Sequence, residues 1–186
     1  MSNKIKYGLK NVHYAVVTED ESGKVTYGTP VAWPGAVSLT LSPKGDHNPF
    51  YADDSVYFDV TDNNGYDGTL ESALVPESFK TDVLGYETDK NGNLFENADV
   101  QPKPFALLYE FSGDANQIRH VMYRCVPLRP NEDGKTRGES TEPNTESVSI
   151  TAYPAIDTHR VKGECKADST DYSTFFTKVM TYTAEA

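Results

Sequence analysis

The stretch PFALLYEFSGDANQIRHVMYRCVPL, residues 104–128, decides the fold. It contains two long apolar runs, at residues 104–112 and 117–128, around a polar segment with Gly113 and Asp114. Aromatic and β-branched residues are enriched in β-strands, and glycine with aspartate is typical of a tight turn. The stretch therefore predicts a long hairpin at the centre of a β-rich domain.

Two segments nearer the N-terminus alternate apolar and polar side chains. In residues 36–42, Val37, Leu39 and Leu41 share one face, and residues 55–61 follow the same pattern. A period of two places successive side chains on opposite sides of a strand. Both segments are therefore predicted to be half-buried strands.

Turn residues predict how the strands connect. Residues 62–68 contain two asparagines and two glycines, so residues 55–61 and 69–75 are predicted to form a hairpin. Ser22 and Gly23 predict another turn, in a hairpin near the N-terminus. The remaining predicted strands are residues 12–18, 25–27, 147–153 and 159–165.

One short helix is predicted, at about residues 76–84. Pro76 suits the first helical position, and Gly85 suits the left-handed residue that ends a helix. Phe79 and Val83 lie four residues apart, so they share one face. The predicted fold class is therefore mainly β, a sandwich or barrel with one short flanking helix.

The length of 186 residues predicts a single domain over residues 1–186. Within it, residues 1–11 are expected to form an N-terminal arm. Residues 166–186 form a C-terminal segment in which the sequence favours a short helix over a last strand. Residues 43–55 and 129–146 are predicted loops.

The two loops are candidates for contacts between subunits. Residues 43–55 are unusually apolar for a loop in water, because they carry Phe50 and Tyr51. Residues 129–146 contain almost no apolar residue and are long, which suggests a role at an interface. The candidate contact residues are Phe50, Tyr51, Asp53, Asp54, Arg129, Lys135 and Arg137.

Charge and hydropathy limit the partners of the chain. The formal net charge is −11, and the acidic residues are spread along the sequence, which argues against clamping phosphates. No apolar run approaches the roughly 20 residues of a membrane span, and residues 1–10 lack the apolar core of a signal peptide. We therefore expect no membrane contact, no tight binding of nucleic acid, and synthesis and assembly in the cytosol.

Motifs that carry catalysis are missing from the sequence. It contains no His-Glu-x-x-His and no Gly-x-Ser-x-Gly. Gly134-Lys135-Thr136 resembles the end of a phosphate loop, but the first glycine of that loop would fall at Arg129. Cys125 and Cys165 stand at no metal-ligand spacing and are predicted to be reduced and buried. We expect no catalytic residue, no cofactor and no enzyme activity.

The residues around Asp62 partly match a calcium-binding loop. Asp62, Asn64, Gly65 and Glu71 occupy the third, fifth, sixth and twelfth positions of an EF-hand, but Val60 stands at the first. Because the first position normally supplies an anchoring carboxylate, the sequence favours a hairpin turn. Calcium held between subunits is the alternative, and no metal-binding residue is assigned.

Several short motifs follow one another in a fixed order along residues 5–153. They are Gly8-Leu9-Lys10-Asn11-Val12, Pro34-Gly35-Ala36-Val37-Ser38-Leu39, Tyr51-Ala52-Asp53, Asn64-Gly65-Tyr66-Asp67-Gly68, Lys103-Pro104-Phe105-Ala106-Leu107, Arg119-His120-Val121-Met122-Tyr123 and Ser149-Ile150-Thr151-Ala152. Each motif is short, but their shared order and spacing resemble the major tail proteins, or tail tube proteins, of bacteriophages with long non-contractile tails.

The resemblance implies a structural virion protein. Members of this family close into six-fold rings that stack into a hollow tail tube, through which DNA passes without specific binding. The expected partners are further copies of the chain, the tape measure protein, the tail tip or baseplate, and the tail terminator. Assembly is expected in the cytoplasm of the host bacterium, with the N-terminal arm and both loops in contacts within and between rings.

Two alternatives have different consequences. The same fold could serve as the inner tube of a contractile tail or of a secretion-system injection machine. A carbohydrate-binding or carbohydrate-cleaving β-sandwich is the other alternative, in which Trp33 and the tyrosines would stack on sugars.

Overall fold

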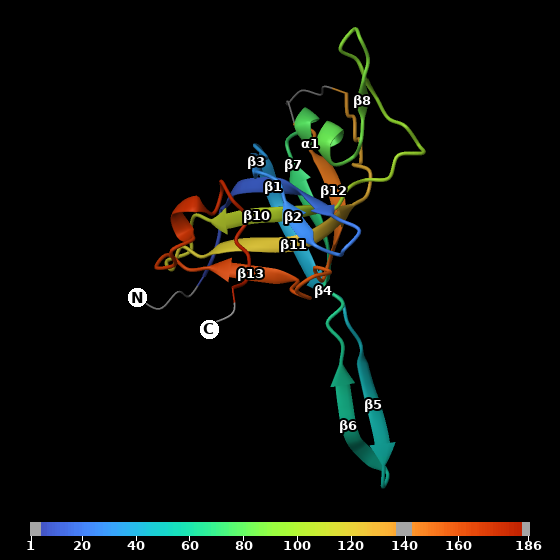
Figure 1. The fold of residues 1–186 in the computed structure, drawn as a ribbon, viewed down its shortest axis with the longest axis vertical. Coiled ribbons are helices and arrows are strands. Elements are labelled where there is room, and N and C mark those ends of the chain that lie inside the picture. Colours follow the sequence, from blue (N-terminus) through green and yellow to red (C-terminus); the bar gives the residue numbers. More distant parts are fainter. Residues whose placement is uncertain (1–4, 137–142, 184–186) are drawn as a thin grey trace.

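The computed structural model describes residues 5–136 and 143–183, and its regular elements are almost all β-strands (Figure 1). The elements are β1 Leu9–Glu19, β2 Val25–Tyr27, β3 Val31–Ala32, β4 Ala36–Pro43, β5 His47–Ala52, β6 Ser55–Thr61, β7 Tyr66–Ser72, α1 Glu77–Asp82, β8 Glu87–Thr88, β9 Leu94–Phe95, β10 Phe105–Phe111, β11 Arg119–Pro127, β12 Glu146–Tyr153, β13 Lys162–Cys165 and the 3-10 turn η1 Tyr172–Thr174. The predicted class, mainly β with one short helix, is confirmed for the described residues, whose strands form no closed barrel.

An antiparallel sheet forms the body of the molecule. Its strand order is β2-β1-β10-β11-β12-β7-β4, with β13 paired to one half of β11 and β3 to β1. The predicted hairpin of residues 104–128 lies at its centre, where β10 and β11 pair from Phe105↔Cys125 to Glu110↔Arg119. The predicted N-terminal hairpin is also confirmed, as β1 and β2.

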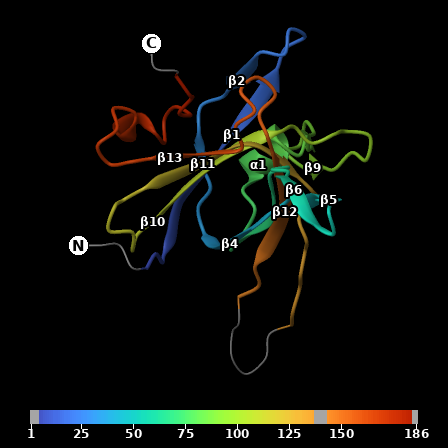
Figure 2. The same ribbon diagram turned by 90° about the horizontal axis from the view of Figure 1, so that it is seen from below.

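Both faces of the central strands are buried, which explains why the apolar run at β10 is continuous rather than alternating. On one face Phe105 and Leu107 pack against α1 and its neighbours. On the other face Leu108 packs with Phe175 and Val179 of the C-terminal segment. Figure 2 shows that this segment lies beside β13, on the side away from α1.

The helix packs against the sheet through one buried aromatic side chain, and Asp82 at its end accepts a hydrogen bond from the Tyr14 hydroxyl. Phe79 has no exposed surface, and its ring centroid lies 5.1 Å from that of Tyr14, 4.4 Å from Trp33 and 5.2 Å from Phe105. Edge-to-face and tilted pairs of this kind add to the free energy gained by burial. Gly85 follows the helix with a φ of +74°, so the predicted helix and its glycine stop are confirmed.

Two local predictions are wrong, and a third is met only in part. Residues 55–61 do not pair with residues 69–75, because β6 pairs with β5, and β7 pairs with β12 and β4. Val37 does not share the face of Leu39, since a register shift between Ala36 and Ser38 leaves it 54% exposed. The short helix favoured for the C-terminal segment is reduced to the three-residue 3-10 turn η1 among its described residues.

The predicted N-terminal arm is only partly an arm. Leu9 to Asn11 already belong to β1, where Leu9 pairs with Phe111. Residues 1–4 lie outside the described residues. Cys125 and Cys165 are buried and unpaired, as predicted.

Candidate assembly surface

A two-stranded hairpin, β5–β6, projects from the body of the molecule (Figure 1). It pairs only with itself, from His47↔Thr61 at its base to Ala52↔Ser55 at its tip. Every residue of β6 is exposed, and so is every residue of β5 except Ala52, which is partly exposed. The prediction that residues 43–55 form a loop is therefore wrong, because most of them form the first strand of this hairpin.

The turn at the hairpin tip explains the error. Asp53 and Asp54 join the strands in two residues with φ angles of +51° and +56°, as a two-residue hairpin turn of the primed type requires. Asparagine and glycine are the usual residues there, and aspartate tolerates this conformation better than most others. Two adjacent aspartates between two alternating segments are the signal that could have located the turn.

Both faces of the hairpin carry exposed apolar side chains, with Phe50, Phe58 and Val60 on one face and Tyr51 and Val56 on the other. Phe50 pairs with Phe58, and Asn48 pairs with Val60, so these side chains share one face. The opposite face carries a polar pair near the base, where His47 Nδ1 lies 2.9 Å from Asp59 Oδ2. The face of Phe50, Phe58 and Val60 is called the apolar face below.

The apolar face is open to solvent within the described chain. Phe50 and Phe58 are each 62% exposed. Tyr57, the bulge residue of β6, is 72% exposed. A lone hairpin is only marginally stable in water, and clustered exposed apolar residues mark binding surfaces. These side chains therefore have the character of a binding surface.

The base of the hairpin is held firmly to the sheet. The Lys44 N–H donates to the Gly65 carbonyl at 2.8 Å, and the Asn64 N–H donates to the Lys44 carbonyl at 2.8 Å. Gly65 has a φ of +97°, and a Cβ there would overlap the backbone oxygen of Ala152. The hairpin consequently has a defined direction relative to the body.

A second surface of assembly type is the outer edge of β4. No strand among the described residues pairs with that edge, and its sequence AVSLTLSP contains no charged residue. Natural proteins usually protect exposed edges with lysine, with bulges or by covering them. Here the bulge near Val37 and the final Pro43 are the protective features of the edge.

The predicted contact residues fall in different places. Phe50 lies on the apolar face and Tyr51 on the opposite face, while Asp53 and Asp54 form the tip. Lys135 is exposed in the 129–146 segment, and Arg137 lies outside the described residues. Their role in subunit contacts stays a prediction. Sequence reasoning missed Tyr57 and Phe58, which are on the hairpin but outside the predicted loop.

Arg129 has a role inside the chain. Its guanidinium donates to the carbonyls of Leu84, Asn97 and Val100 at 3.0, 3.2 and 3.1 Å, and its Nε lies 3.0 Å from a Glu96 carboxylate oxygen. These contacts hold the two ends of the segment 84–100 next to Arg129. The Arg129 donors are thereby engaged within the molecule, and a contact of Arg129 with a neighbouring subunit stays a prediction.

Comparisons with known proteins give a likeness of structure but not of sequence. No protein-family model matches the chain, and no curated protein matches it. Among solved structures, it is similar to a chain in the six-fold symmetrised cryo-EM structure of the anti-feeding prophage (AFP) baseplate. The TM-score is 0.48 at 6% identity, over 91% of this chain and 99% of that chain.

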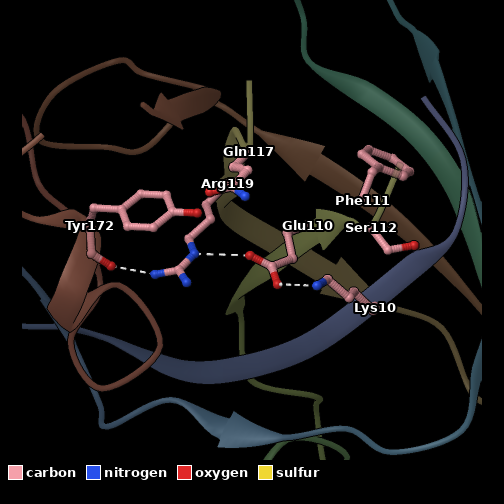
Figure 3. A pocket seen from close by; sticks show the side chains of 7 residues that line it. All are labelled: Lys10, Glu110, Phe111, Ser112, Gln117, Arg119 and Tyr172. Atoms are coloured by element: carbon pink, nitrogen blue, oxygen red, sulfur yellow. Dashed lines mark hydrogen bonds and ion pairs between the residues drawn. The ribbon is translucent and has the colours of Figure 1, made fainter. Parts of the chain in front are cut away.

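A polar pocket of about 290 Å³ lies at the turn end of the β10–β11 hairpin (Figure 3). Glu110 is buried there, with its carboxylate 2.9 Å from Arg119 Nε and 3.3 Å from Lys10 Nζ. Asn11 also donates to it at 2.6 Å. Arg119 in turn donates a hydrogen bond to the Tyr172 carbonyl. Its guanidinium carbon, Cζ, lies 3.7 Å from the centre of the Tyr172 ring. The cluster ties the C-terminal segment to the sheet.

Glu110 makes the attachment sensitive to acid. Burial, the largest single effect, raises the pKa of this carboxyl, but the bonds from Arg119, Asn11 and Lys10 together hold the pKa below its ordinary value of 4.5. A lowered pKa contributes stability that is complete above the unfolded value and is lost as pH falls through the folded value. The cluster should therefore weaken below about pH 4.5.

Replacing Glu110 with glutamine is expected to lower the free energy of unfolding by about 1.5–3 kcal/mol at pH 7, since it removes charge-assisted hydrogen bonds. The difference from wild type should shrink as pH falls below 4.5. Urea unfolding between pH 3 and 7, followed by fluorescence, measures both effects. Glu21→Gln, in an exposed turn, is the control. A difference that does not change with pH would contradict the proposed titration.

Within residues 5–136 and 143–183 no group of three or more His, Cys, Asp or Glu side chains could hold a metal ion. None of the helices in that part of the chain has the length and apolar character to cross a membrane. Trp33 is only 2% exposed, so it cannot act as the sugar-stacking platform of the carbohydrate alternative.

Proposed function

We propose that this chain is a structural tail protein that assembles with copies of itself into the stacked six-fold rings of a phage tail tube. The exposed apolar hairpin is the observation that carries the proposal. A stable monomer would bury Phe50, Phe58 and Val60, whereas each is at least 44% exposed here. Such a surface fits a protein that works in an assembly rather than by catalysis.

The sheet edge supports the same reading. The uncharged β4 edge can pair with an edge strand of a neighbour, which extends the sheet from one subunit to the next around a ring. Closed rings use every edge and so remove the risk of uncontrolled strand pairing. The six-fold order of the ring comes from the family resemblance of the sequence.

The charge of the chain suits a passage for DNA. A formal net charge of −11 per copy would make a tube lumen repel phosphates, so DNA could slide without binding. The tape measure protein, the tail tip or baseplate and the tail terminator are the further partners proposed. Assembly is proposed to take place in the host bacterium, and the finished protein to reside in the virion tail.

The proposal is tested by negative-stain electron microscopy at rising protein concentration. Wild type is expected to form rings or hollow tubes. The double variant Phe50→Asp, Phe58→Asp should lose them, because it places two charges on the apolar face. Seeding with purified tail tips allows for a tube that needs a template to start.

A control on the opposite face separates a specific contact from general damage. His47→Gln with Thr61→Asp alters the same hairpin without touching its apolar face, and tubes should persist. Equal thermal melting of all three proteins establishes that the fold survives. Dispersed monomers of wild type at every concentration, with tail tips present, would count against a tube protein.

A further inference from the structure

The C-terminal segment lies on the sheet without belonging to it. Residues 166–183, called the strap below, follow β13 and cover one face of β10 and β11. Figure 2 shows the strap, in red, beside β13. Among the described residues, backbone hydrogen bonds of the strap join its own residues only, such as the bond from the Thr177 N–H to the Thr174 carbonyl at 2.9 Å. Lifting the strap therefore breaks no strand pairing.

Two buried side chains pack the strap against the sheet. Phe175 has no exposed surface and Val179 is 3% exposed, and both belong to a cluster with Leu108 and Val121. The larger cluster lies on the other face of the sheet, around Phe79, and contains none of the described strap residues. The strap therefore closes a small part of the core that is separate from the rest.

Two arginines outside the strap hold its aromatic rings. Arg119 Cζ lies 3.7 Å from the centre of the Tyr172 ring and 4.7 Å from that of Phe176. Arg160 Cζ lies 3.4 Å from the centre of the Tyr182 ring. A guanidinium stacked on an aromatic ring is attracted to it, but at exposed sites each contact is weak. These contacts favour the closed strap at two separate points without locking it.

An open strap would leave no buried charge without a partner. Arg119 Nε donates to a Glu110 carboxylate oxygen at 2.9 Å, and Lys10 Nζ lies 3.3 Å from the other oxygen. Figure 3 shows Arg119 between Glu110 and Tyr172. The three charged residues belong to β1, β10 and β11, so their contacts survive when Tyr172 moves away. Opening therefore avoids the large cost of leaving a buried ion unpaired.

We infer that the strap opens and closes as one unit over an intact sheet, and that its contacts with Arg119 and Arg160 set how often it opens. Segments with few buried side chains and no backbone bonds to their surroundings open at a lower free energy than the whole molecule. The open form uncovers a second apolar surface, around Leu108 and Val121. The strap belongs to a single copy, so its opening does not depend on the proposed tube.

The two cysteines are natural reporters of local and global opening. Cys165 is 1% exposed, directly precedes the strap and belongs to the cluster of Phe175 and Val179. Cys125 has no exposed surface and belongs to the cluster around Phe79. A buried thiol reacts only when an opening exposes it. Opening of the strap should expose Cys165 alone, whereas global unfolding should expose both thiols.

The test measures alkylation of each thiol by iodoacetamide in the folded protein at about pH 8, followed by mass spectrometry of the peptides. Each rate is divided by the rate of the same thiol in protein unfolded with urea. Cys165 is expected to react about 100-fold faster than Cys125, or more. Low urea concentrations should accelerate Cys125 more steeply, because global unfolding exposes more surface. Equal normalised rates with equal urea dependence would overturn the inference.

Three variants identify which part of the molecule opens. Tyr182→Ala removes the contact with Arg160 and should accelerate Cys165 about two- to fivefold. Tyr153→Ala is the matched control, because Tyr153 lies 5.8 Å from Arg124 Cζ but belongs to β12. It should leave the Cys165 rate unchanged. Phe79→Leu weakens only the other cluster, so it should accelerate Cys125 up to about tenfold and leave Cys165 unchanged.

Two results from these variants would contradict the strap. An unchanged Cys165 rate in Tyr182→Ala would show that the end of β13 frays by itself while the strap stays in place. Acceleration of both thiols by Phe79→Leu would show that the molecule opens only as a whole. Circular dichroism spectra identical to wild type establish that each variant is folded.

Discussion

Replacing Phe79 with alanine is expected to lower the free energy of unfolding by about 3–5 kcal/mol. The side chain has no exposed surface and contacts the rings of Tyr14, Trp33 and Phe105. Its removal leaves a cavity between α1 and the sheet, and three aromatic pairs are lost. For a chain of this size the midpoint of thermal unfolding should fall by about 10 °C or more.

Differential scanning calorimetry and urea unfolding measure this loss. Phe95→Ala is the control, since Phe95 is 55% exposed and its replacement should change the free energy by less than about 0.5 kcal/mol. Hydrogen exchange should show that residues 77–83 lose protection first, because Phe79 is the fully buried side chain of α1. Similar effects for the two substitutions would mean that α1 is not anchored through Phe79.

The second large effect is expected from Gly65→Ala, at about 2–5 kcal/mol. The φ of +97° costs an alanine about 1–2 kcal/mol. The added Cβ would also overlap the Ala152 carbonyl oxygen on β12, and relief of such overlap costs about 1–3 kcal/mol more. Because β12 is a central strand and Gly65 holds Lys44, movement here also shifts the base of the hairpin.

Gly92→Ala separates the two causes. Gly92 has a φ of +85°, but a Cβ there meets no atom within 4 Å, so only the conformational cost of about 1–2 kcal/mol should remain. Urea denaturation of both variants gives the comparison. An equal loss in the two proteins would show that the contact with Ala152 is relaxed at no cost.

The body of the fold could be predicted from the sequence because its signals are local and redundant. The run from Phe105 to Tyr109 is apolar at every position, since both faces of β10 are buried. The helix at Glu77–Asp82 is marked independently by Pro76, Phe79 and Gly85. Where the hydrophobic period and the turn residues agree, the sequence predicts both the position of a secondary-structure element and whether it is a helix or a strand.

The assembly surface could be predicted only in part. Phe50 and Tyr51 stood out because they are apolar residues in a segment read as a loop, but the segment is a strand. Residues 55–61 can pair with the strand before them, through a turn at Asp53-Asp54, or with the strand after them, through a turn at residues 62–68. The sequence signals for these two turns are of similar strength. Once the forward pairing was preferred, Tyr57 and Phe58 were assigned to a half-buried strand and so were not recognised as exposed.

Contacts between distant parts of the chain had no local signal. Glu110, Arg119 and Tyr172 come together although Tyr172 lies 53 positions after Arg119 in the sequence. In the sequence they are ordinary charged and aromatic residues. An apolar groove around Leu74 likewise combines Pro34 and Leu94 with the start of α1, and only the completed sheet brings them to one place.

The pairing of β1 with β10 has a consequence for the order of folding. Tyr14 pairs with Leu107 and Leu9 with Phe111, so this part of the sheet closes only after a long loop has formed, and long-range strand pairing is slow. The β5–β6 hairpin has a two-residue turn, and local hairpins form within about 1–10 μs. A newly made chain therefore forms the exposed apolar β5–β6 hairpin well before the main sheet has closed. During that interval the chain is most prone to incorrect association with other chains.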